Sequence, residues 1–291
     1  MIIKEINVKN ILTKSNLPIA GYSINPYVGC THACKYCYAN FMKRFTNHKE
    51  DWGTFLDVKY WPKISNPHKY DGSTMIIGSV TDGYIPQESE YKRTRQFLEE
   101  IKGANINLII TTKSDLVLRD LDLIKTFPNP LIAWSINTLD ENFKMQMEKT
   151  TSIARRIEAM KICHNLNIRT TCFISPIFPG ITNVFEIMDK IKDYVDYIWL
   201  ENLNLRGDFK VKIMEYIKSN KSELLPLYES IYNKGDMSYW IKLDKEVKEY
   251  AFKNSLEYLI DKEPFLKEVK GKPIIINYFY HSDIKQSAKI R

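Results

Sequence analysis

The sequence predicts an α/β fold, a partial (β/α)6 barrel of the TIM type with a helical C-terminal extension. Short apolar or β-branched segments recur along the chain, and longer segments with apolar residues at three- and four-residue spacing lie between them. Strands that alternate with helices form parallel sheets, and no glycine-rich nucleotide-binding motif favours a doubly wound sheet. The 291 residues suffice for one such domain, and a hydrophobic fraction of 44% is ample for its core.

Six segments are predicted to form the parallel strands of the barrel. Each is short, apolar or β-branched, and leads into a turn. In barrels of this type the chemistry takes place at the C-terminal ends of the strands, so the loops that follow them should hold the functional residues. The predicted strands are residues 23–29, 74–80, 106–112, 131–137, 169–175 and 197–202.

Helices are predicted between these strands, and the pattern changes after the sixth strand. No linker, low-complexity tract or repeat divides the chain. We therefore predict an N-terminal segment (residues 1–22), one barrel domain (23–206) and a C-terminal extension (207–291). The helices predicted in the barrel are residues 90–102, 115–127, 153–167 and 184–195. In the extension, helices are predicted over residues 211–220, 224–233 and 244–260, followed by a strand over 272–280.

Charge and composition restrict the function only weakly. Lys and Arg number 42 against 35 Asp and Glu, and this net charge of +7 favours anionic partners but also suits lysine-rich helix surfaces. The N-terminus lacks the apolar core of a signal peptide, and no apolar run approaches the roughly 20 residues of a membrane helix. We expect a cytoplasmic protein without membrane contact. An odd number of cysteines, five, favours metal or redox chemistry over disulfides.

Three of these cysteines lie in the segment "NPYVGCTHACKYCYANF", directly after the first predicted strand. Cys30, Cys34 and Cys37 supply one thiolate fewer than a structural zinc site or an ordinary cubane cluster requires. The missing ligand can leave one metal position open to a substrate or cofactor. Zinc with His32 as fourth ligand is the alternative, although Cys30 and His32 are too close in sequence for an easy tetrahedral arrangement.

The spacing Cys-x3-Cys-x2-Cys, with Tyr36 before the last cysteine, resembles the signature of the radical S-adenosylmethionine (SAM) superfamily. The resemblance implies a 4Fe-4S cluster on Cys30, Cys34 and Cys37, with the fourth iron chelated by the amino and carboxylate groups of SAM. It also implies an external electron donor of the flavodoxin or ferredoxin type. One electron then cleaves SAM to methionine and a 5'-deoxyadenosyl radical.

Five further segments resemble the spore photoproduct lyase-like group, and each follows a predicted strand. The resemblance covers roughly residues 25–206 and selects the same strand ends as the barrel prediction. The segments are "GSVTDGYIPQE" (78–88), "TTKSDLVLRD" (111–120), "SINTLDE" (135–141), "ISPIFPG" (174–180) and "LENLNLRG" (200–207).

The resemblance implies contacts to SAM from several of these loops. Ser79, Thr81 and Asp82 occupy the loop that holds the methionine amino group in the superfamily, although Ser-Val-Thr-Asp replaces the usual Gly-Gly-Glu type of sequence. Lys113 is placed to neutralise the methionine carboxylate. A turn at Asp82 and a solvated lysine at 113 are the structural alternatives. The other predicted cofactor contacts are Tyr36, Ser135, Asn137, Ser175, Asn202 and Arg206.

The sequence indicates the cofactor more clearly than it indicates the substrate. Spore photoproduct lyase has a hydrogen-donating cysteine just before the Asp segment, and Ser79 occupies that position here. A serine O–H bond is too strong for the same step, so lesion repair is in doubt while SAM cleavage is not. We predict a radical SAM enzyme that acts on a nucleic acid base or another anionic substrate. A peptide- or small-molecule-modifying radical enzyme, and a noncatalytic iron-sulfur or zinc protein that binds nucleic acid, are the alternatives.

Overall fold

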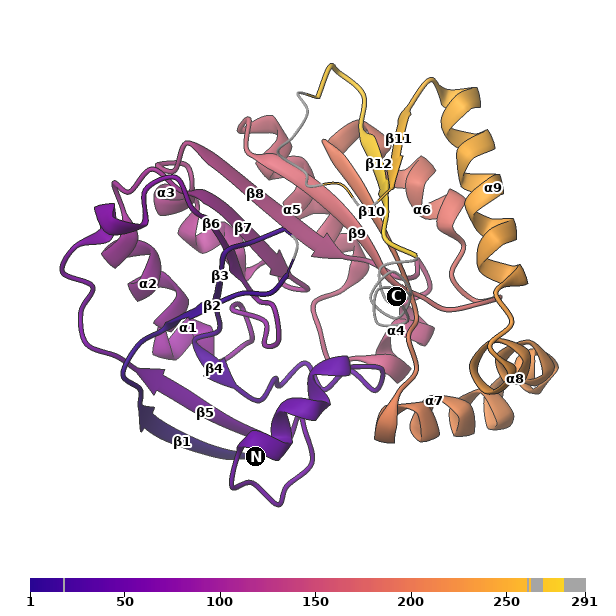
Figure 1. Ribbon diagram of the computed structural model, residues 1–291, viewed down its shortest axis with the longest axis horizontal. Coiled ribbons are helices and arrows are strands. Elements are labelled where there is room, and N and C mark those ends of the chain that lie inside the picture. The colour runs from indigo at the N-terminus through magenta and orange to yellow at the C-terminus, as the bar shows by residue number, and fades with distance from the viewer. Residues whose placement is uncertain (18, 261, 263–268, 280–291) are drawn as a thin grey trace, which may run out of the picture. The chain divides into compact units, whose positions relative to one another are not determined.

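The computed structural model describes residues 1–17, 19–260, 262 and 269–279 (Figure 1). The chain divides into two compact units. The first comprises residues 1–134 and 141–170, and the second comprises residues 135–140 and the chain from 171 onward. The division into residues 1–22, 23–206 and 207–291 that the sequence suggests stays a prediction.

The main sheet of the first unit contains four of the six predicted strands. Its strands are parallel, except that β2 runs antiparallel to β3. Ile24 of β3 pairs with Ile77 of β6, and Ile77 pairs with Ile110 of β7, so the carboxyl ends of these strands lie at one edge. The order is β8 (Asn129–Ser135), β7 (Asn107–Thr112), β6 (Thr74–Ile77), β3 (Tyr22–Ile24) and β2 (Leu12–Lys14).

The core of this unit forms on both faces of the sheet. Ile76 points to the opposite side of β6 from Met75 and Ile77, yet all three side chains are buried, and the same holds in β7 for Ile109 and its neighbours Leu108 and Ile110. A strand that is covered on both faces needs a continuous apolar run rather than alternation. The continuous apolar runs in the sequence therefore predicted these segments correctly as buried parallel strands.

The prediction of a single strand over residues 23–29 is wrong, because part of this segment belongs to a second, smaller sheet. That segment is not one strand, because β3 ends at Ile24 and Tyr27–Val28 forms β4, which pairs antiparallel with β5 (Phe55–Tyr60). Pro26 lies between the two strands and has no N–H group to continue the first ladder. Strand β1 (Ile2–Asn7) runs parallel to β5 along its other edge.

Helices of the first unit follow its strands as predicted, but several are short. The predicted helix 115–127 is a 3-10 turn followed by one turn of α-helix, whereas 153–167 is a regular helix whose cap, Ser152, accepts a hydrogen bond from the Arg155 N–H (3.3 Å). The helices are η1 (Tyr38–Phe45), η2 (Pro67–Tyr70), α1 (Glu88–Tyr91), α2 (Arg93–Ile101), η3 (Leu116–Asp120), α3 (Leu121–Ile124), α4 (Glu141–Met147) and α5 (Ile153–Asn165).

The second unit has a parallel sheet in the order β9 (Arg169–Ile177), β10 (Tyr197–Asn202), β12 (Ile274–Asn277) and β11 (Glu257–Ile260). These strands include the last two predicted for the barrel and the late strand. Part of the late-strand prediction, residue 280, lies outside the described residues. The helices are α6 (Val184–Ile191), η4 (Lys192–Tyr194), α7 (Gly207–Asn220), η5 (Ser222–Leu224), α8 (Leu225–Lys234) and α9 (Ser238–Asn254).

The predicted helix 244–260 is wrong at its C-terminal end. Helix α9 stops at Asn254, and residues 257–260 form β11. Ser255 adopts a left-handed conformation with φ of 54°, and the Leu256 N–H returns to the Ala251 carbonyl at 2.8 Å. This left-handed cap ends the helix despite the apolar spacing that continues beyond it. In the described part of the chain, no helix combines the length and apolar character that a membrane span needs.

Candidate functional site

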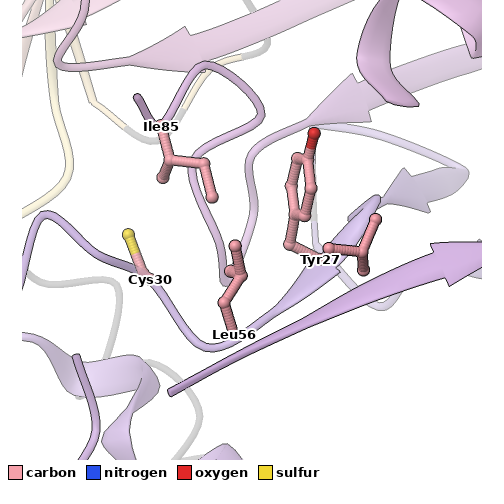
Figure 2. Close-up of a cluster of buried hydrophobic side chains, with 5 residues drawn as sticks. Tyr27, Cys30, Leu56 and Ile85 are labelled. Carbon is pink, nitrogen blue, oxygen red and sulfur yellow. The ribbon is translucent and has the colours of Figure 1, made fainter. Parts of the chain in front are cut away.

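The cysteine loop, residues 30–37, lies in the first unit and contains three free thiols. Two tight turns shape it, because the Ala33 N–H donates to the Cys30 carbonyl and the Cys37 N–H to the Cys34 carbonyl, both at 3.1 Å. Cys30 is buried, while Cys34 and Cys37 are half-buried. Figure 2 shows Cys30 at the edge of an apolar cluster, with its sulfur directed away from Tyr27. The apolar contacts thus fix the loop without enclosing all three thiols.

Two glycines allow the chain to approach this loop closely. Gly29 has φ of +88°, and a Cβ atom there would lie 2.4 Å from the Phe55 carbonyl oxygen. Gly53 has φ of +97°, and its Cβ would lie 2.7 Å from the Cβ of Ala33 inside the loop. Both positions need the left-handed conformation and the absence of a side chain. The loop is therefore held against β5 and the turn before it.

Asn25 joins the end of β3 to the loop after β6. Its side-chain amide donates to the Ser79 hydroxyl at 2.9 Å, and its carbonyl accepts from the N–H groups of Val80 (3.0 Å) and Thr81 (3.2 Å). The structure therefore brings Ser79 and Thr81, two predicted cofactor contacts, to the start of the segment that leads into the cysteines. The Thr81 hydroxyl is buried and has no hydrogen-bond partner among the described residues.

The Asp82 carboxylate connects three loops. It accepts hydrogen bonds from the N–H of Lys113 (2.7 Å), the hydroxyl of Thr112 (2.9 and 3.0 Å) and the N–H of Tyr84 (2.8 Å), and it pairs with Nε2 of His32 at 2.9 Å. Burial alone would raise the pKa of Asp82, but His32 and the backbone N–H groups lower it. The carboxylate thereby ties the cysteine loop to the ends of β6 and β7.

The end of α4 packs directly on the cysteine loop. The Lys35 N–H donates to the Met147 carbonyl at 2.9 Å, and the Lys149 N–H donates to the His32 carbonyl at 2.7 Å. These bonds place the side chain of Glu148 beside Cys34, with 3.8 Å between Oε2 and Sγ.

Glu148 is part of a buried polar cluster. Arg156 of α5 forms an ion pair with it, and both side chains are 1% exposed. The Tyr36 hydroxyl donates to Glu148 as well, and the hydroxyl of Thr150 donates at 2.7 Å. Buried charges are tolerated when they are paired and hydrogen-bonded, and this cluster satisfies both conditions. Tyr36, a predicted cofactor contact, is thus anchored through its hydroxyl beneath the loop.

The pKa values of all three thiols are raised. Burial, helped by Asp82 and Cys37, raises the pKa of Cys30 to about 12. Burial and the Glu148 carboxylate raise the pKa of Cys34, and burial also raises that of Cys37. The positive charge of Lys113 lowers the pKa of both Cys34 and Cys37 and so stabilises their thiolates. A metal that binds these thiols must displace their protons, and Lys113 favours that exchange.

The zinc alternative requires the cysteines and His32 to converge on one ion. Among residues 1–17, 19–260, 262 and 269–279, no three His, Cys, Asp or Glu side chains are grouped closely enough to hold a metal ion, and this finding applies equally to zinc and to a cluster. The Nε2 atom of His32 pairs with Asp82 at 2.9 Å. The zinc alternative stays a prediction.

The remaining predicted cofactor contacts belong to the second unit. Ser135 and Asn137 are buried, and the amide nitrogen of Asn137 has no partner among the described residues. The Ser175 hydroxyl donates to Glu201 at 2.6 Å. Asn202 ends β10, and Arg206 is exposed at the start of α7, where it donates to the Asn204 side chain at 3.0 Å. Their role in cofactor binding stays a prediction.

The two cysteines outside the loop are buried as packing residues. Cys163 lies on α5 and Cys172 on β9, and both are fully buried. Burial raises the pKa of each thiol, and in the described part of the chain no charged side chain stabilises either thiolate.

Several residues of the site were not predicted from the sequence. Asn25 and Thr112 lie inside the recognised segments, and a search for polar side chains at strand ends would have selected them. Glu148 and Arg156 had no such signal, because Glu148 is 114 residues from Cys34 in the chain. Glu88 lies inside a recognised segment, yet its burial against the Arg119 guanidinium at 2.5 Å was not anticipated.

Comparison with known proteins identifies the class that this fold and site define. The model of the radical SAM superfamily matches residues 24–193, which include all three cysteines of the loop. The chain therefore belongs to the radical SAM superfamily. The protein is an enzyme of this superfamily, and its cofactors are a 4Fe-4S cluster and SAM.

The chain is also similar to several individual proteins. An uncharacterized protein of Methanocaldococcus jannaschii is 36% identical over 238 residues, which is 81% of this chain and 89% of the relative. A variant of spore photoproduct lyase with bound AdoMet and dinucleoside spore photoproduct has a TM-score of 0.56 at 16% identity, covering 73% of this chain. Streptococcus suis SuiB bound to its precursor peptide SuiA has a TM-score of 0.54 at 14% identity, covering 91% of this chain.

These solved structures support the fold alone. The chain spans 65% of the spore photoproduct lyase chain and 50% of the SuiB chain. Their likeness confirms the α/β class with a mostly parallel sheet that the sequence predicts for a partial barrel.

Proposed function

We propose that Cys30, Cys34 and Cys37 bind the 4Fe-4S cluster, that SAM occupies its open iron, and that the substrate is a nucleic acid base. When bound, the cluster and SAM supply reductive cleavage to a 5'-deoxyadenosyl radical that abstracts hydrogen from the substrate. The observation that most directly supports this proposal is the cysteine loop with its three free thiols. His32 in this loop pairs with Asp82, which connects the loop to the ends of β6 and β7.

The donor set fits these cofactors. Three thiols on one loop match the ligand count of a cubane cluster with one open iron. The unpartnered, buried hydroxyl of Thr81 lies on the loop that Asn25 ties to the start of the cysteine segment. A buried hydroxyl without a partner is costly unless a ligand completes it, and the polar methionine group of SAM is such a ligand.

The protein's own residues orient and balance the charges around the cluster. We assign Lys113 to the carboxylate of SAM, since its charge already acts on Cys34 and Cys37. Tyr36 lies between Lys113 and Glu148, because its ring is 5.8 Å from the Lys113 ammonium and its hydroxyl donates to Glu148. The ion pair of Glu148 with Arg156 then holds Tyr36, and with it the cysteine loop, in place.

Further contacts to SAM are proposed from the second unit. We assign Ser135, Asn137, Ser175 and Asn202 to the ribose and adenine parts, and Arg206 to a carboxylate or phosphate. The amide nitrogen of Asn137, which has no partner among the described residues, favours a polar ligand at this position. Ser79 and Asp82 complete the set on the first unit. An external flavodoxin- or ferredoxin-type protein would supply the electron, and its chemistry requires a reducing compartment such as the cytoplasm.

The substrate proposal rests on charge and likeness. The net charge of +7 suits an anionic polymer, and the spore photoproduct lyase structure of similar fold has a bound dinucleoside spore photoproduct. Ser79 stands where that enzyme group has a hydrogen-donating cysteine, so we do not propose the same repair reaction. A peptide substrate is the second candidate, because SuiB has a similar fold and is bound to a precursor peptide.

The test is an anaerobic activity measurement. The protein is reconstituted with iron and sulfide, reduced with dithionite and mixed with SAM, and 5'-deoxyadenosine is measured by mass spectrometry alongside iron and zinc. We expect about four irons per chain and formation of 5'-deoxyadenosine. One tightly bound zinc, without cluster or cleavage, would contradict the assignment. Adding DNA, RNA or peptide to the active enzyme then identifies the substrate class by an increase in 5'-deoxyadenosine.

A further inference from the structure

The helix η1 follows the third cysteine without a break and exposes three aromatic side chains. Tyr38 is 55% exposed, Phe41 44% and Phe45 67%, which makes this segment unusually apolar for a surface. The helix is a 3-10 helix of eight residues, longer than the short pieces in which this conformation usually occurs. Side chains three residues apart in a 3-10 helix lie directly above one another. Tyr38, Phe41 and Arg44 therefore form one column along its surface.

The rings of this column are already arranged for stacking. Tyr38 and Phe41 stack with an interplanar angle of 27° and centroids 6.5 Å apart, and Phe45 meets Phe41 edge-on at 6.5 Å. The Arg44 guanidinium lies 5.4 Å from the Phe41 centroid and 4.7 Å from that of Phe45. Tyr38 is fixed at its other end, because its hydroxyl donates to the Ser79 carbonyl. Phe45 is outside the three-residue spacing but contacts Phe41, so we include it and call Tyr38, Phe41, Arg44 and Phe45 together the aromatic column.

The charge around the aromatic column selects the kind of partner. From Lys35 to Lys49 inclusive the chain has four Lys or Arg residues and no Asp or Glu, and Glu50 and Asp51 follow, with the Asp51 carboxylate 3.9 Å from the Lys43 ammonium. Lys35, Arg44 and Lys49 are exposed. Exposed aromatic rings beside cationic side chains are the pattern by which proteins bind single-stranded nucleic acid, because bases stack on the rings and phosphates meet the cations. An uncharged apolar partner would gain nothing from these cations.

We propose that the aromatic column is a stacking platform for unpaired bases of a single-stranded nucleic acid. This inference deepens the proposed function, since it rests on a nucleic acid substrate and gives it a binding site. The column begins at the residue after Cys37, so a strand stacked on it runs toward the cysteine loop. The Tyr38 bond to the Ser79 carbonyl links it to the loop assigned to SAM.

The test measures binding separately from catalysis. Fluorescence anisotropy of a labelled 12-nucleotide single strand, as DNA and as RNA, is recorded with the anaerobically reconstituted full chain. Phe41→Ala and Phe45→Ala should each weaken binding roughly fivefold or more, the loss expected for one stacked base. The matched control is Phe252→Ala, because Phe252 is 87% exposed on α9 and lies outside the column. Phe41→Tyr keeps the ring and should retain the affinity.

Four outcomes are distinguished, with iron content and thermal unfolding showing that each variant is folded. Loss of affinity in Phe41→Ala and Phe45→Ala, with Phe252→Ala and Phe41→Tyr unchanged, supports it, and the tighter of DNA and RNA names the polymer. Equal affinity in all variants overturns it, even if 5'-deoxyadenosine still forms. Unchanged nucleic acid affinity with slower cluster reduction by flavodoxin also overturns it and makes the column a docking surface for the electron donor. If the column binds nucleic acid but no SAM is cleaved, the site stands and the proposed function fails.

Discussion

Arg156 and Glu148 form an ion pair that is 1% exposed on each side and lies beside the Cys34 thiol. Removal of one partner from a buried pair leaves an uncompensated charge. We therefore expect Arg156→Met to lower the free energy of unfolding by about 3 kcal/mol or more. The double variant Arg156→Met/Glu148→Met should recover part of this loss, because it removes both charges. Urea denaturation of the metal-free proteins measures both, and a single-variant loss below about 1 kcal/mol would contradict the role of the pair.

The Glu148 carboxylate should make the free energy of unfolding depend on pH. Burial alone would raise the pKa of Glu148, but Arg156, Lys113 and the Tyr36 hydroxyl lower it from 4.5 to about 2. Because the pKa is lower in the folded state, the stabilisation is complete above pH 4.5 and is lost as pH falls toward 2. Wild-type apoprotein should therefore lose more stability over this interval than Glu148→Gln, which cannot titrate there. Parallel pH profiles for the two proteins would exclude this contribution.

The cysteines divide into ligands and packing residues, and single substitutions distinguish them. Cys34→Ala should lose cluster iron and form no 5'-deoxyadenosine, because the cluster loses a ligand. Cys163→Ala should keep both, at a stability cost of about 1 kcal/mol for a small cavity. Iron content and product are measured side by side. Substantial cleavage by Cys34→Ala would refute the ligand assignment, and a folded Cys163→Ala without cluster would refute the packing role.

The parts that the sequence could predict are those encoded locally. Apolar runs such as Leu108–Ile110 identify buried parallel strands, and the cysteine spacing identifies the site, because both signals lie within a few residues of each other. The assignment of Ser79, Thr81 and Asp82 to SAM followed from the family resemblance, and it stays a prediction. These predictions needed no knowledge of which distant segments meet.

The parts that escaped prediction depend on distant partners. Glu148 looks like any helix-end carboxylate until Arg156 and Tyr36 bury it, and Asp82 looks like a turn residue until Thr112 and Lys113 donate to it. The end of α9 was missed because its periodic apolar pattern continues past the left-handed cap. Local patterns specify which element a segment prefers but not which side chain will neutralise a buried charge.

Lys113 provides a test of cofactor binding that leaves the site's framework intact. Its backbone N–H holds Asp82, so replacement of the side chain keeps that bond. Lys113→Met should retain the cluster but bind SAM about tenfold more weakly, because the methionine carboxylate loses its cation. Equilibrium dialysis with labelled SAM measures the affinity, with exposed Lys125→Met as the control. Unchanged affinity for SAM would mean that Lys113 is a solvated loop lysine without a role in cofactor binding.

Thr81 separates a ligand-binding hydroxyl from a structural one. Its hydroxyl is buried without a partner in the described structure, so Thr81→Val should not lower the free energy of unfolding. If the hydroxyl contacts SAM, the same variant should bind SAM about fivefold more weakly, which is the value of one ordinary hydrogen bond. A structural hydroxyl would give the opposite pair of results, with lower stability and unchanged affinity. Thermal unfolding without SAM and dialysis with SAM therefore decide between the two roles, and Thr81→Ser, which keeps the hydroxyl, should restore the affinity.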